Sequence, residues 1–389
     1  MDSPAGCVTQ RAIRKRAEPD RVNRVMRLLV LRTAILVLGA AAVAAIPITM
    51  VLGHTPVNSS TARPLKTQAG GDFDDHQAQI ARRVAASTPA ATPAATPAAA
   101  PASASPVGPS HAAPPAPTPG VVPAFSHIFV IVMENHEYGS VVGRPDAPYI
   151  NSLAARYGLA TNYYAASHPS LPNYLALTAG STFGVASDCT TCYVNATNIA
   201  DQVELSGRSW KAYMEDMPTP CFLGASSGNY AMKHNPFMYY TDIRNDAARC
   251  AAHVVPLTQI GVDLSAVQVP NFVWITPNIC NDTHDCPVST GDAWLGNIVP
   301  QITGSAAFRN GGVLFITWDE GSSNASCCGD AWGGHVATLV ISPRSIAGVR
   351  STIAENHYSL LRTIEDGFGL GHLGAAGWSS SVAMREYFR

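Results

Sequence analysis

The chain has 389 residues, of which 47% are hydrophobic and 13% charged, and its formal net charge is -2. Without a basic surplus there is no electrostatic basis for binding nucleic acid, so we expect no nucleic-acid partner. The length allows one large folded domain together with flanking segments.

The amino-terminal segment has the charge pattern of a membrane anchor. Residues 1–32 carry eight Arg or Lys residues, whereas residues 33–53 contain no charged side chain. Twenty-one mostly apolar residues can cross a bilayer as one helix, and the basic block before them favours the cytoplasmic side. We therefore expect a cytoplasmic segment over 1–32, a single-pass transmembrane signal-anchor helix over 33–53, and an extracytoplasmic location for the rest of the chain. The alternatives are a buried core helix and a cleaved signal peptide, which Ala42-Val43-Ala44 would suit and which would give a secreted protein.

Residues 54–122 are rich in Pro, Ala and Thr and offer little that could form a core. A short repeat, Thr-Pro-Ala-Ala, occupies residues 88–95. Because prolines favour extended polyproline II stretches, we expect a disordered linker that holds residues 123–389 away from the membrane as one folded domain.

Within 123–389, continuous apolar runs alternate with helical patterns. The expected strands are Ile128 to Met133, Phe272 to Thr276, Val313 to Trp318 and Ala337 to Ser342. The expected helices are Leu171 to Leu177, Ile199 to Leu205, Ala293 to Ile302 and Tyr358 to Phe368. This alternation predicts an α/β fold with a mainly parallel central sheet flanked by helices, and ligands at the carboxyl ends of its strands.

Polar pairs directly follow two of these strands. The first strand ends in Glu134-Asn135, and the third ends in Asp319-Glu320. Carboxylate and amide oxygens suit a hard cation, and adjacent carboxylates at the end of a buried strand repel each other unless a cation or donors lie between them. The pattern favours a divalent metal, although Asn135 alone could simply turn the chain.

Ser170 lies in the segment that leads into the first expected helix, between His168 and Pro172-Asn173. Pro172 suits the first turn of a helix, which places Ser170 near the helix cap. A serine at this position is either a helix cap or a nucleophile. A nucleophile there would attack a phosphoryl group whose negative charge the free amides of the helix stabilise. The spacing does not choose between the two.

Two further loops carry candidate side chains. Asn278 to Asp285 follows the second strand and contains Asp282 and His284, a density of polar groups that a solvated loop could also have. Gly333-Gly334-His335 precedes the fourth strand. His335 is either a functional residue or simply a histidine in a turn.

Eight cysteines fall after the linker, and Cys7 stands alone before the expected membrane helix. An even number in an oxidising compartment indicates disulfides, although a structural zinc site is an alternative. Close spacing favours the pairs Cys189 with Cys192, Cys221 with Cys250, Cys280 with Cys286, and Cys327 with Cys328.

Taken in this order, the motifs resemble a bacterial phosphoesterase family that contains acid phosphatases and phospholipases of the C type, within the alkaline-phosphatase-like superfamily. The resemblance rests on Met133-Glu134-Asn135, on residues 167–174, on residues 281–285, and on Thr317-Trp318-Asp319-Glu320 followed by Gly334-His335.

The resemblance implies a role for each matching residue. Glu134, Asn135, Asp319 and Glu320 would bind one divalent metal, which could be Ca²⁺, Mg²⁺, Mn²⁺ or Zn²⁺. Ser170 would attack phosphorus to give a phosphoserine, with His168, His284 and His335 facing the phosphate. His284 or His335 would protonate the leaving alcohol. The candidate substrate-binding residues are Asn173, Asp282 and Asp285.

The expected activity is that of an extracytoplasmic, metal-dependent phosphomonoesterase of the acid phosphatase type. The chain ends soon after Tyr387-Phe388, without the second carboxyl-terminal module of larger phospholipase relatives. A phospholipase C activity and a catalytically silent surface binding module are the alternatives. The sequence gives no indication of the oligomeric state.

Overall fold

The structure, a computed structural model, describes residues 120–389. The predicted cytoplasmic segment, the membrane helix, Cys7 and nearly all of the predicted linker lie outside the described residues. Within 120–389, none of the helices combines the length and apolar character that a membrane span requires.

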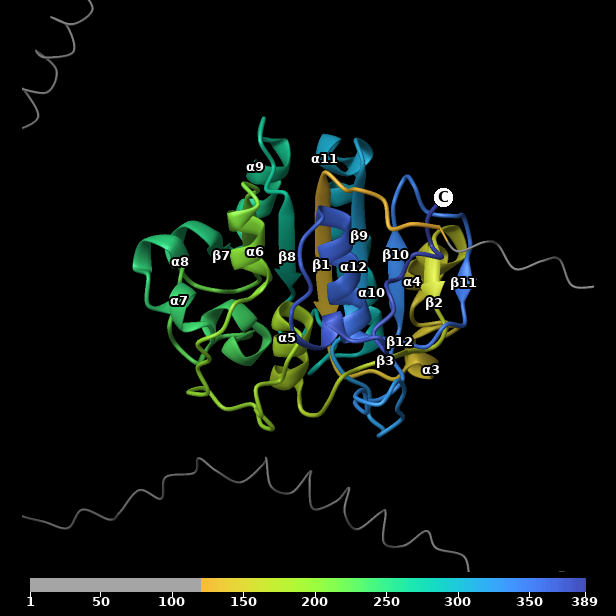
Figure 1. The fold of residues 1–389 in the computed structure, drawn as a ribbon, viewed down its shortest axis with the longest axis horizontal. Helices are drawn as coiled ribbons and strands as arrows, with labels where there is room; N and C mark the ends of the chain where they lie inside the picture. The colour runs from red at the N-terminus through yellow and green to blue at the C-terminus, as the bar shows by residue number, and fades with distance from the viewer. Residues whose placement is uncertain (1–119) are drawn as a thin grey trace, which may run out of the picture. The chain divides into compact units, whose positions relative to one another are not determined.

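The domain is built around an eight-stranded mixed sheet with the strand order β11-β2-β10-β9-β1-β8-β4-β7 (Figure 1). The central strands β1 (His127–Met133), β8 (Phe272–Thr276) and β9 (Gly312–Trp318) are parallel to one another. β10 (Thr338–Ile341) is antiparallel to β9 and to β2, so it alone runs against the other strands of this sheet. The outer strands are β2 (Gly158–Ala160), β4 (Trp210–Met214), β7 (Val254–Pro256) and β11 (Arg350–Ser351).

Helices cover both faces of this sheet. Figure 1 shows α12 in front of the central strands and α10 behind them. The α-helices are α3 (Tyr138–Val141), α4 (Pro148–Arg156), α5 (Ser170–Ala179), α6 (Ile199–Leu205), α7 (Thr241–Arg244), α8 (Ala247–His253), α9 (Ile260–Ser265), α10 (Val288–Gly304), α11 (Ala306–Arg309) and α12 (His357–Phe368).

Short elements complete the domain. The small strand pairs are β3 (Tyr163–Tyr164) with β12 (Glu355–Asn356), and β5 (Ser226–Ser227) with β6 (Tyr230–Ala231). The 3₁₀ helices are η1 (Met232–His234), η2 (Pro236–Met238), η3 (Leu257–Gln259) and η4 (Gly374–Gly377).

The α/β architecture confirms the predicted fold class, and each of the four predicted strands and four predicted helices is present. The central strands β8 and β9 are buried along their whole length, as their unbroken apolar sequences require when helices cover both faces. The antiparallel direction of β10 was not foreseen, because a continuous apolar run has the same pattern in either direction.

The eight cysteines of the domain form four disulfides, Cys189–Cys192, Cys221–Cys250, Cys280–Cys286 and Cys327–Cys328. All four predicted pairs are therefore confirmed. No cysteine of the described chain is left to build the alternative zinc site.

Candidate active site

Three polar loops meet at the carboxyl edge of the central sheet. Glu134 follows β1, and its N–H donates to the carbonyl of Asp282 at 2.8 Å. Asp319 follows β9, and its N–H donates to the carbonyl of Met133 at 2.9 Å. The carboxylates of Glu134, Asp319 and Asp282 are fully buried, and Glu320 is buried as well. Four acidic side chains from three loops therefore share one site, where parallel strands place their ligands.

Ser170 begins α5 and points into this group. Its Oγ lies 3.1 Å from Oε2 of Glu134 and 3.4 Å from Oε1 of Glu320, and it is the donor in both contacts. The hydroxyl does not accept from an amide of its own helix, so Ser170 is not a helix cap. The N–H of Leu171 donates instead to Oδ1 of Asp188 at 3.0 Å. The alternative that a cap alone explains this serine is therefore wrong.

The segment before Ser170 is fixed by backbone contacts. Asn173 is buried, its Oδ1 accepts from the N–H of Ser167 at 2.8 Å, and its Nδ2 donates to the carbonyls of Ser167 at 2.8 Å and Pro169 at 3.0 Å. Gly333 packs on the same segment, where an added Cβ would lie 2.2 Å from the carbonyl oxygen of Ser167. Asn173 thus braces the chain, and its proposed contact with substrate stays a prediction.

A histidine that the sequence analysis did not select completes the centre. His234, in η1, is buried, and its Nδ1 lies 3.1 Å from Oδ2 of Asp282. Its Nε2 lies 3.4 Å from Oε2 of Glu134. Glu134, His234 and Asp282 can each direct one ligand atom to a common point, because these atoms lie within 4.8 Å of one another. The three residues form a possible metal-binding triad.

Burial and mutual repulsion change the pKa of these groups. Burial, followed by the negative charges of Asp319 and Asp282, raises the pKa of the Glu134 carboxyl well above its usual value. Burial and the charge of Glu320 raise the pKa of Asp319 to about 8. Burial and the charge of Lys233 lower the pKa of His234 well below its usual value. His234 is therefore neutral, which is the state that a metal ligand requires.

Two polar atoms of the centre have no hydrogen-bond partner among the described residues. They are Oδ2 of Asp319 and Nε2 of His234, and both are buried. An unpaired buried polar atom is costly, and carboxylates packed together repel one another. A divalent cation held by Glu134, His234 and Asp282 would give Nε2 of His234 a partner and reduce the repulsion among the carboxylates, so the donor set fits a metal ion.

Asn135 and Glu320, the other two predicted metal ligands, lie at the same edge. The N–H of Asn135 donates to Oδ1 of Asp319 at 3.0 Å, and its backbone has φ 56, a left-handed value that Asn tolerates better than most residues. Oε2 of Glu320 accepts from Nδ1 of His168. Burial lowers the pKa of His168, but the hydrogen bond and charge of Glu320 outweigh this effect and raise it.

Lys233 brings a positive charge to the opposite side of the centre. Its Nζ donates to Oδ2 of Asp188 at 3.0 Å and to Nε2 of His284 at 3.2 Å. Nδ1 of His284 in turn lies 2.6 Å from Oδ1 of Asp285, which is partly exposed. The side chain of Lys233 is 20% exposed.

His335 has different neighbours. Its ring is stacked between Tyr138 and Tyr164, with centroid distances of 4.6 and 5.2 Å, and its Nε2 lies 3.1 Å from the carbonyl oxygen of Thr161. The hydrogen bonds of the described residues do not join it to Ser170. Its predicted contact with phosphate stays a prediction.

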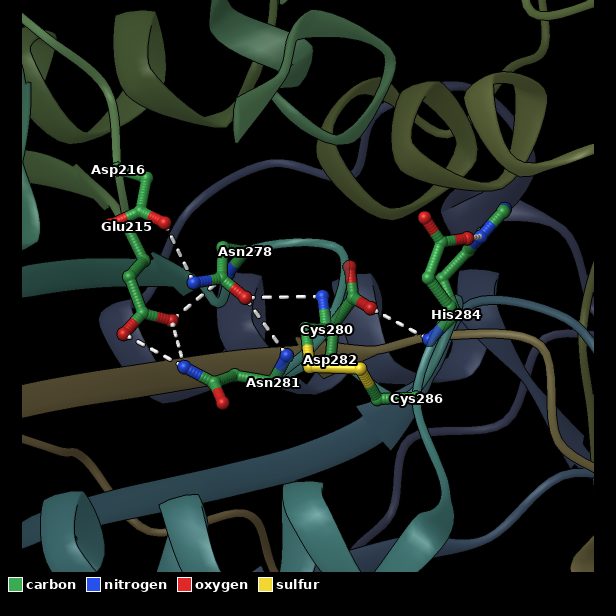
Figure 2. The surroundings of a disulfide bond; sticks show 9 residues. Glu215, Asp216, Asn278, Cys280, Asn281, Asp282, His284 and Cys286 are labelled. Atoms are coloured by element: carbon green, nitrogen blue, oxygen red, sulfur yellow. Dashed lines mark hydrogen bonds and ion pairs between the residues drawn. A yellow bond between two sulfur atoms is a disulfide. The ribbon is translucent and has the colours of Figure 1, made fainter. Parts of the chain in front are cut away.

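A brace outside the centre holds the loop that carries Asp282 and His284 (Figure 2). Oε2 of Glu215, just after β4, accepts from the N–H of Asn278 at 3.0 Å, and both of its carboxylate oxygens accept from Nδ2 of Asn281 at 3.0 Å. The Cys280–Cys286 disulfide closes the same loop. Glu215 therefore positions this loop without reaching the centre itself.

Comparison with known proteins identifies the family. The model of the Phosphoesterase family matches residues 143–371, which are 229 of the 389 residues. The chain belongs to the Phosphoesterase family. A phosphatidylinositol-3-phosphatase of Mycobacterium tuberculosis is 32% identical over 260 residues, which cover 66% of this chain and 81% of that protein.

Other relatives of this phosphoesterase are acid phosphatases. That of Aspergillus fumigatus is 28% identical over 274 residues, covering 68% of this chain and 59% of that protein. The chain thus spans about three fifths of the length of that fungal relative. A Vibrio parahaemolyticus protein of the alkaline phosphatase superfamily has a similar structure, with a TM-score of 0.46, 11% identity, and coverage of 69% of this chain and 71% of that one.

The family match and the phosphatase relatives confirm the resemblance of the motifs to this phosphoesterase family. The protein is a hydrolase that acts on phosphate esters. The motifs pointed to the strand ends and to Ser170, which the structure brings together, but they did not point to His234, Lys233 or Glu215. The run Lys233-His234-Asn235-Pro236 was the available signal, and it was weak because no apolar strand precedes it.

Proposed function

We propose that this phosphoesterase is a metal-dependent phosphomonoesterase in which Ser170 is the nucleophile. The observation that carries the proposal is the position of the Ser170 hydroxyl at the start of α5, 3.1 Å from Glu134 and 3.4 Å from Glu320. The amino end of a ten-residue helix carries a partial positive charge, which stabilises the negative charge of a phosphoryl group there.

The chemistry divides into two displacements at phosphorus. Ser170 Oγ gives its proton to a neighbouring carboxylate, Glu134 or Glu320, and forms the new O–P bond while the bond from phosphorus to the leaving oxygen breaks. The leaving alcohol takes a proton from a histidine. Water then attacks the phosphoserine, and the Ser170 oxygen recovers its proton as inorganic phosphate leaves.

His168 and His284 are the candidate acids. His168 contacts Glu320, which faces Ser170, and His284 contacts Lys233. Both imidazole side chains are 25% exposed, so either can meet a substrate oxygen. The loss of rate caused by removing the true acid should increase with the pKa of the leaving alcohol, which separates His168→Ala from His284→Ala in a series of aryl and alkyl phosphates.

Glu134, His234, Asp282 and Asp319 are the residues that would hold a divalent metal, with Asn135 and Glu320 beside them. When bound, the ion would neutralise phosphoryl oxygens and favour the ionised form of the serine. Lys233 adds a fixed positive charge for the phosphate dianion, which the surrounding carboxylates would otherwise repel. Buried oxygens and one neutral imidazole suit Ca²⁺, Mg²⁺, Mn²⁺ or Zn²⁺, and the proposal does not depend on which of them binds.

We also propose that the domain works outside the cytoplasm. Four disulfides within one domain support this location, because disulfides persist mainly in oxidising compartments. Tagging the amino terminus and testing protease access to the domain in intact cells would check it. A domain that is accessible only after lysis would contradict the proposal.

The activity is tested with the full chain and two substrates, p-nitrophenyl phosphate and phosphatidylcholine. We expect hydrolysis of the monoester and at least about a hundredfold loss in Ser170→Ala, as for the removal of a nucleophile or a major electrostatic group. Ser140→Ala is the matched control, because the Ser140 hydroxyl donates to the carbonyl of Glu137 in its own turn at 2.7 Å and otherwise lies 3.5 Å from Nδ1 of His136, away from Ser170. Faster cleavage of phosphatidylcholine would favour a phospholipase C, and no hydrolysis at all would favour a binding module.

A further inference from the structure

A groove of about 490 Å³ opens beside the active site. Three aromatic side chains line it, Trp332, Trp378 and Tyr358, together with small residues of the loop from Gly180 to Ala186. Trp332 is 47% exposed and Trp378 is 50% exposed. Two half-exposed tryptophans in one groove are unusual for a surface without a ligand.

The groove and the active site share two walls. One is the segment before the nucleophile, because Ser167 lines the groove and the next residue, His168, packs edge-on against Trp332 with a centroid distance of 5.5 Å. The other is the loop that continues from Ala186 to Asp188, whose carboxylate accepts from the N–H of Leu171 and from Lys233. The groove therefore adjoins the segment that carries His168 and the nucleophile.

The shared wall is rigid. The N–H of Trp332 donates to the carbonyl of Ala166 at 3.2 Å, and that of Gly333 donates to the carbonyl of Ala165 at 3.0 Å. Gly333 has no room for a side chain against Ser167. The position of Trp332 relative to the nucleophile is thus set by backbone contacts, as a preformed subsite requires.

The lining determines what the groove can hold. Asp330 is its single charged residue, and none of the described lining residues is a cation. A second phosphate or another anion would therefore be repelled. Flat aromatic faces with hydroxyls of Ser181 and Thr182 nearby suit an uncharged ring.

We propose that this groove binds the leaving group of the substrate, and that this group is an uncharged six-membered ring alcohol. The inference rests on the proposed function, since it assumes that the phosphate is held at Ser170. An aromatic ring stacks on tryptophan through its flat face and a cyclitol through the C–H bonds of one ring face, and the substrates below distinguish them.

The kinetic test compares phenyl phosphate, myo-inositol 1-phosphate and ethyl phosphate in the full chain. Trp378→Ala should raise KM about fivefold for at least one ring ester, with kcat changed by less than about twofold and ethyl phosphate unaffected, because one stacked aromatic contact contributes about 1 kcal/mol. The ring ester that responds identifies the ring as aromatic or cyclitol. Trp378→Phe should restore most of the affinity, and Leu205→Ala, which removes an exposed apolar side chain at the end of α6, should change nothing.

A binding measurement tests the role of the groove independently of hydrolysis. In Ser170→Ala, calorimetry should show tighter binding of a ring ester than of ethyl phosphate, and Trp378→Ala in that background should remove the difference. Equal effects of Trp378→Ala on the binding of all three esters, or no effect on any of them, would contradict the proposal that the groove binds the leaving group. If no ester is hydrolysed but the ring preference in binding persists, the proposed function fails while the subsite stands.

Discussion

Buried carboxyls occur in two settings in this domain, and the two settings differ in the groups that surround the carboxyls. At the active site Glu134, Asp282 and Asp319 lie together beside a serine and a neutral histidine. Elsewhere Glu355 and Glu365 are fully buried, and each has at least one neutral donor, the hydroxyl of Tyr387 at 2.7 Å and the N–H of Leu373 at 2.7 Å.

The two settings differ in how the negative charge of the carboxyls can be neutralised. An isolated buried carboxyl becomes neutral by binding a proton, which costs little below its raised pKa. Several carboxyls that share their space with unpaired ligand atoms, as Asp319 and His234 do, are better neutralised by one cation. Burial of an acid alone therefore does not indicate a metal site. Several acids that converge on a neutral imidazole do indicate one.

Removal of the metal should give the largest effect. Dialysis against a chelator should lower phosphatase activity at least about a thousandfold, because a metal ion supplies several kcal/mol of charge stabilisation in the transition state. Return of Ca²⁺, Mg²⁺, Mn²⁺ or Zn²⁺ should restore it. Elemental analysis should find the ion lost from His234→Ala and kept in His253→Ala, whose imidazole contacts the carbonyl of Trp210 instead. Full activity in metal-free protein would show that the clustered acids are neutralised by protons after all.

Loss of the fixed cation should come next. Lys233→Ala should lower kcat/KM about a hundredfold, in the range found when one charge-stabilising donor is removed. Lys211→Ala is a matched control, because Lys211 also pairs with an aspartate, Asp263, at 2.8 Å and is equally exposed at 21%. Steady-state kinetics with p-nitrophenyl phosphate would measure both variants. Similar losses of kcat/KM in the two variants would mean that Lys233 contributes to stability and not to binding of the phosphate.

Weakening the brace of the Asn278–Cys286 loop should have a moderate effect. Glu215→Gln should lower metal affinity or activity by about tenfold, as do other changes to groups that orient ligands. Glu204→Gln is the control, since Glu204 and Glu215 each accept from a tryptophan Nε1. Metal titration separates positioning from simple destabilisation, because a purely structural role would shift the melting temperature of Glu215→Gln while its metal affinity remained that of the wild type.

The smallest expected effect concerns stability at the isolated acid. Burial raises the pKa of Glu365 from 4.5 to about 8. The stabilising contribution of its neutral form is therefore complete below about pH 4.5 and is lost as the pH rises towards 8. Glu365→Gln keeps a neutral side chain and should be more stable than the wild type at pH 8 by roughly 2 kcal/mol.

Thermal unfolding of both proteins at pH 5 and pH 8 checks this prediction. The wild type should lose stability between the two values, and Glu365→Gln should lose less. Asp366→Asn, at the neighbouring and more exposed acid, should behave like the wild type. Parallel curves for the wild type and Glu365→Gln would mean that Glu365 is already ionised in the folded protein.

The sequence by itself determined the elements and the chemistry that they carry. Unbroken apolar runs such as Phe272 to Thr276 can only be strands buried on both faces, and polar pairs at their ends mark the edge where ligands gather. The close spacing of the cysteines was enough to predict all four disulfides. Ser170 was found by its motif, although spacing could not separate a nucleophile from a cap.

Tertiary structure decided which distant side chains meet. His234 and Lys233 follow no strand of the central sheet, yet η1 places them against Asp282 and His284, about 50 residues later in the chain. The groove beside His168 likewise combines Trp332 and Trp378 with the loop from Gly180 to Ala186, which lies roughly 150 to 200 residues earlier in the chain. Periodicity reports which face of an element is buried, but it carries no information about what packs there from far along the chain.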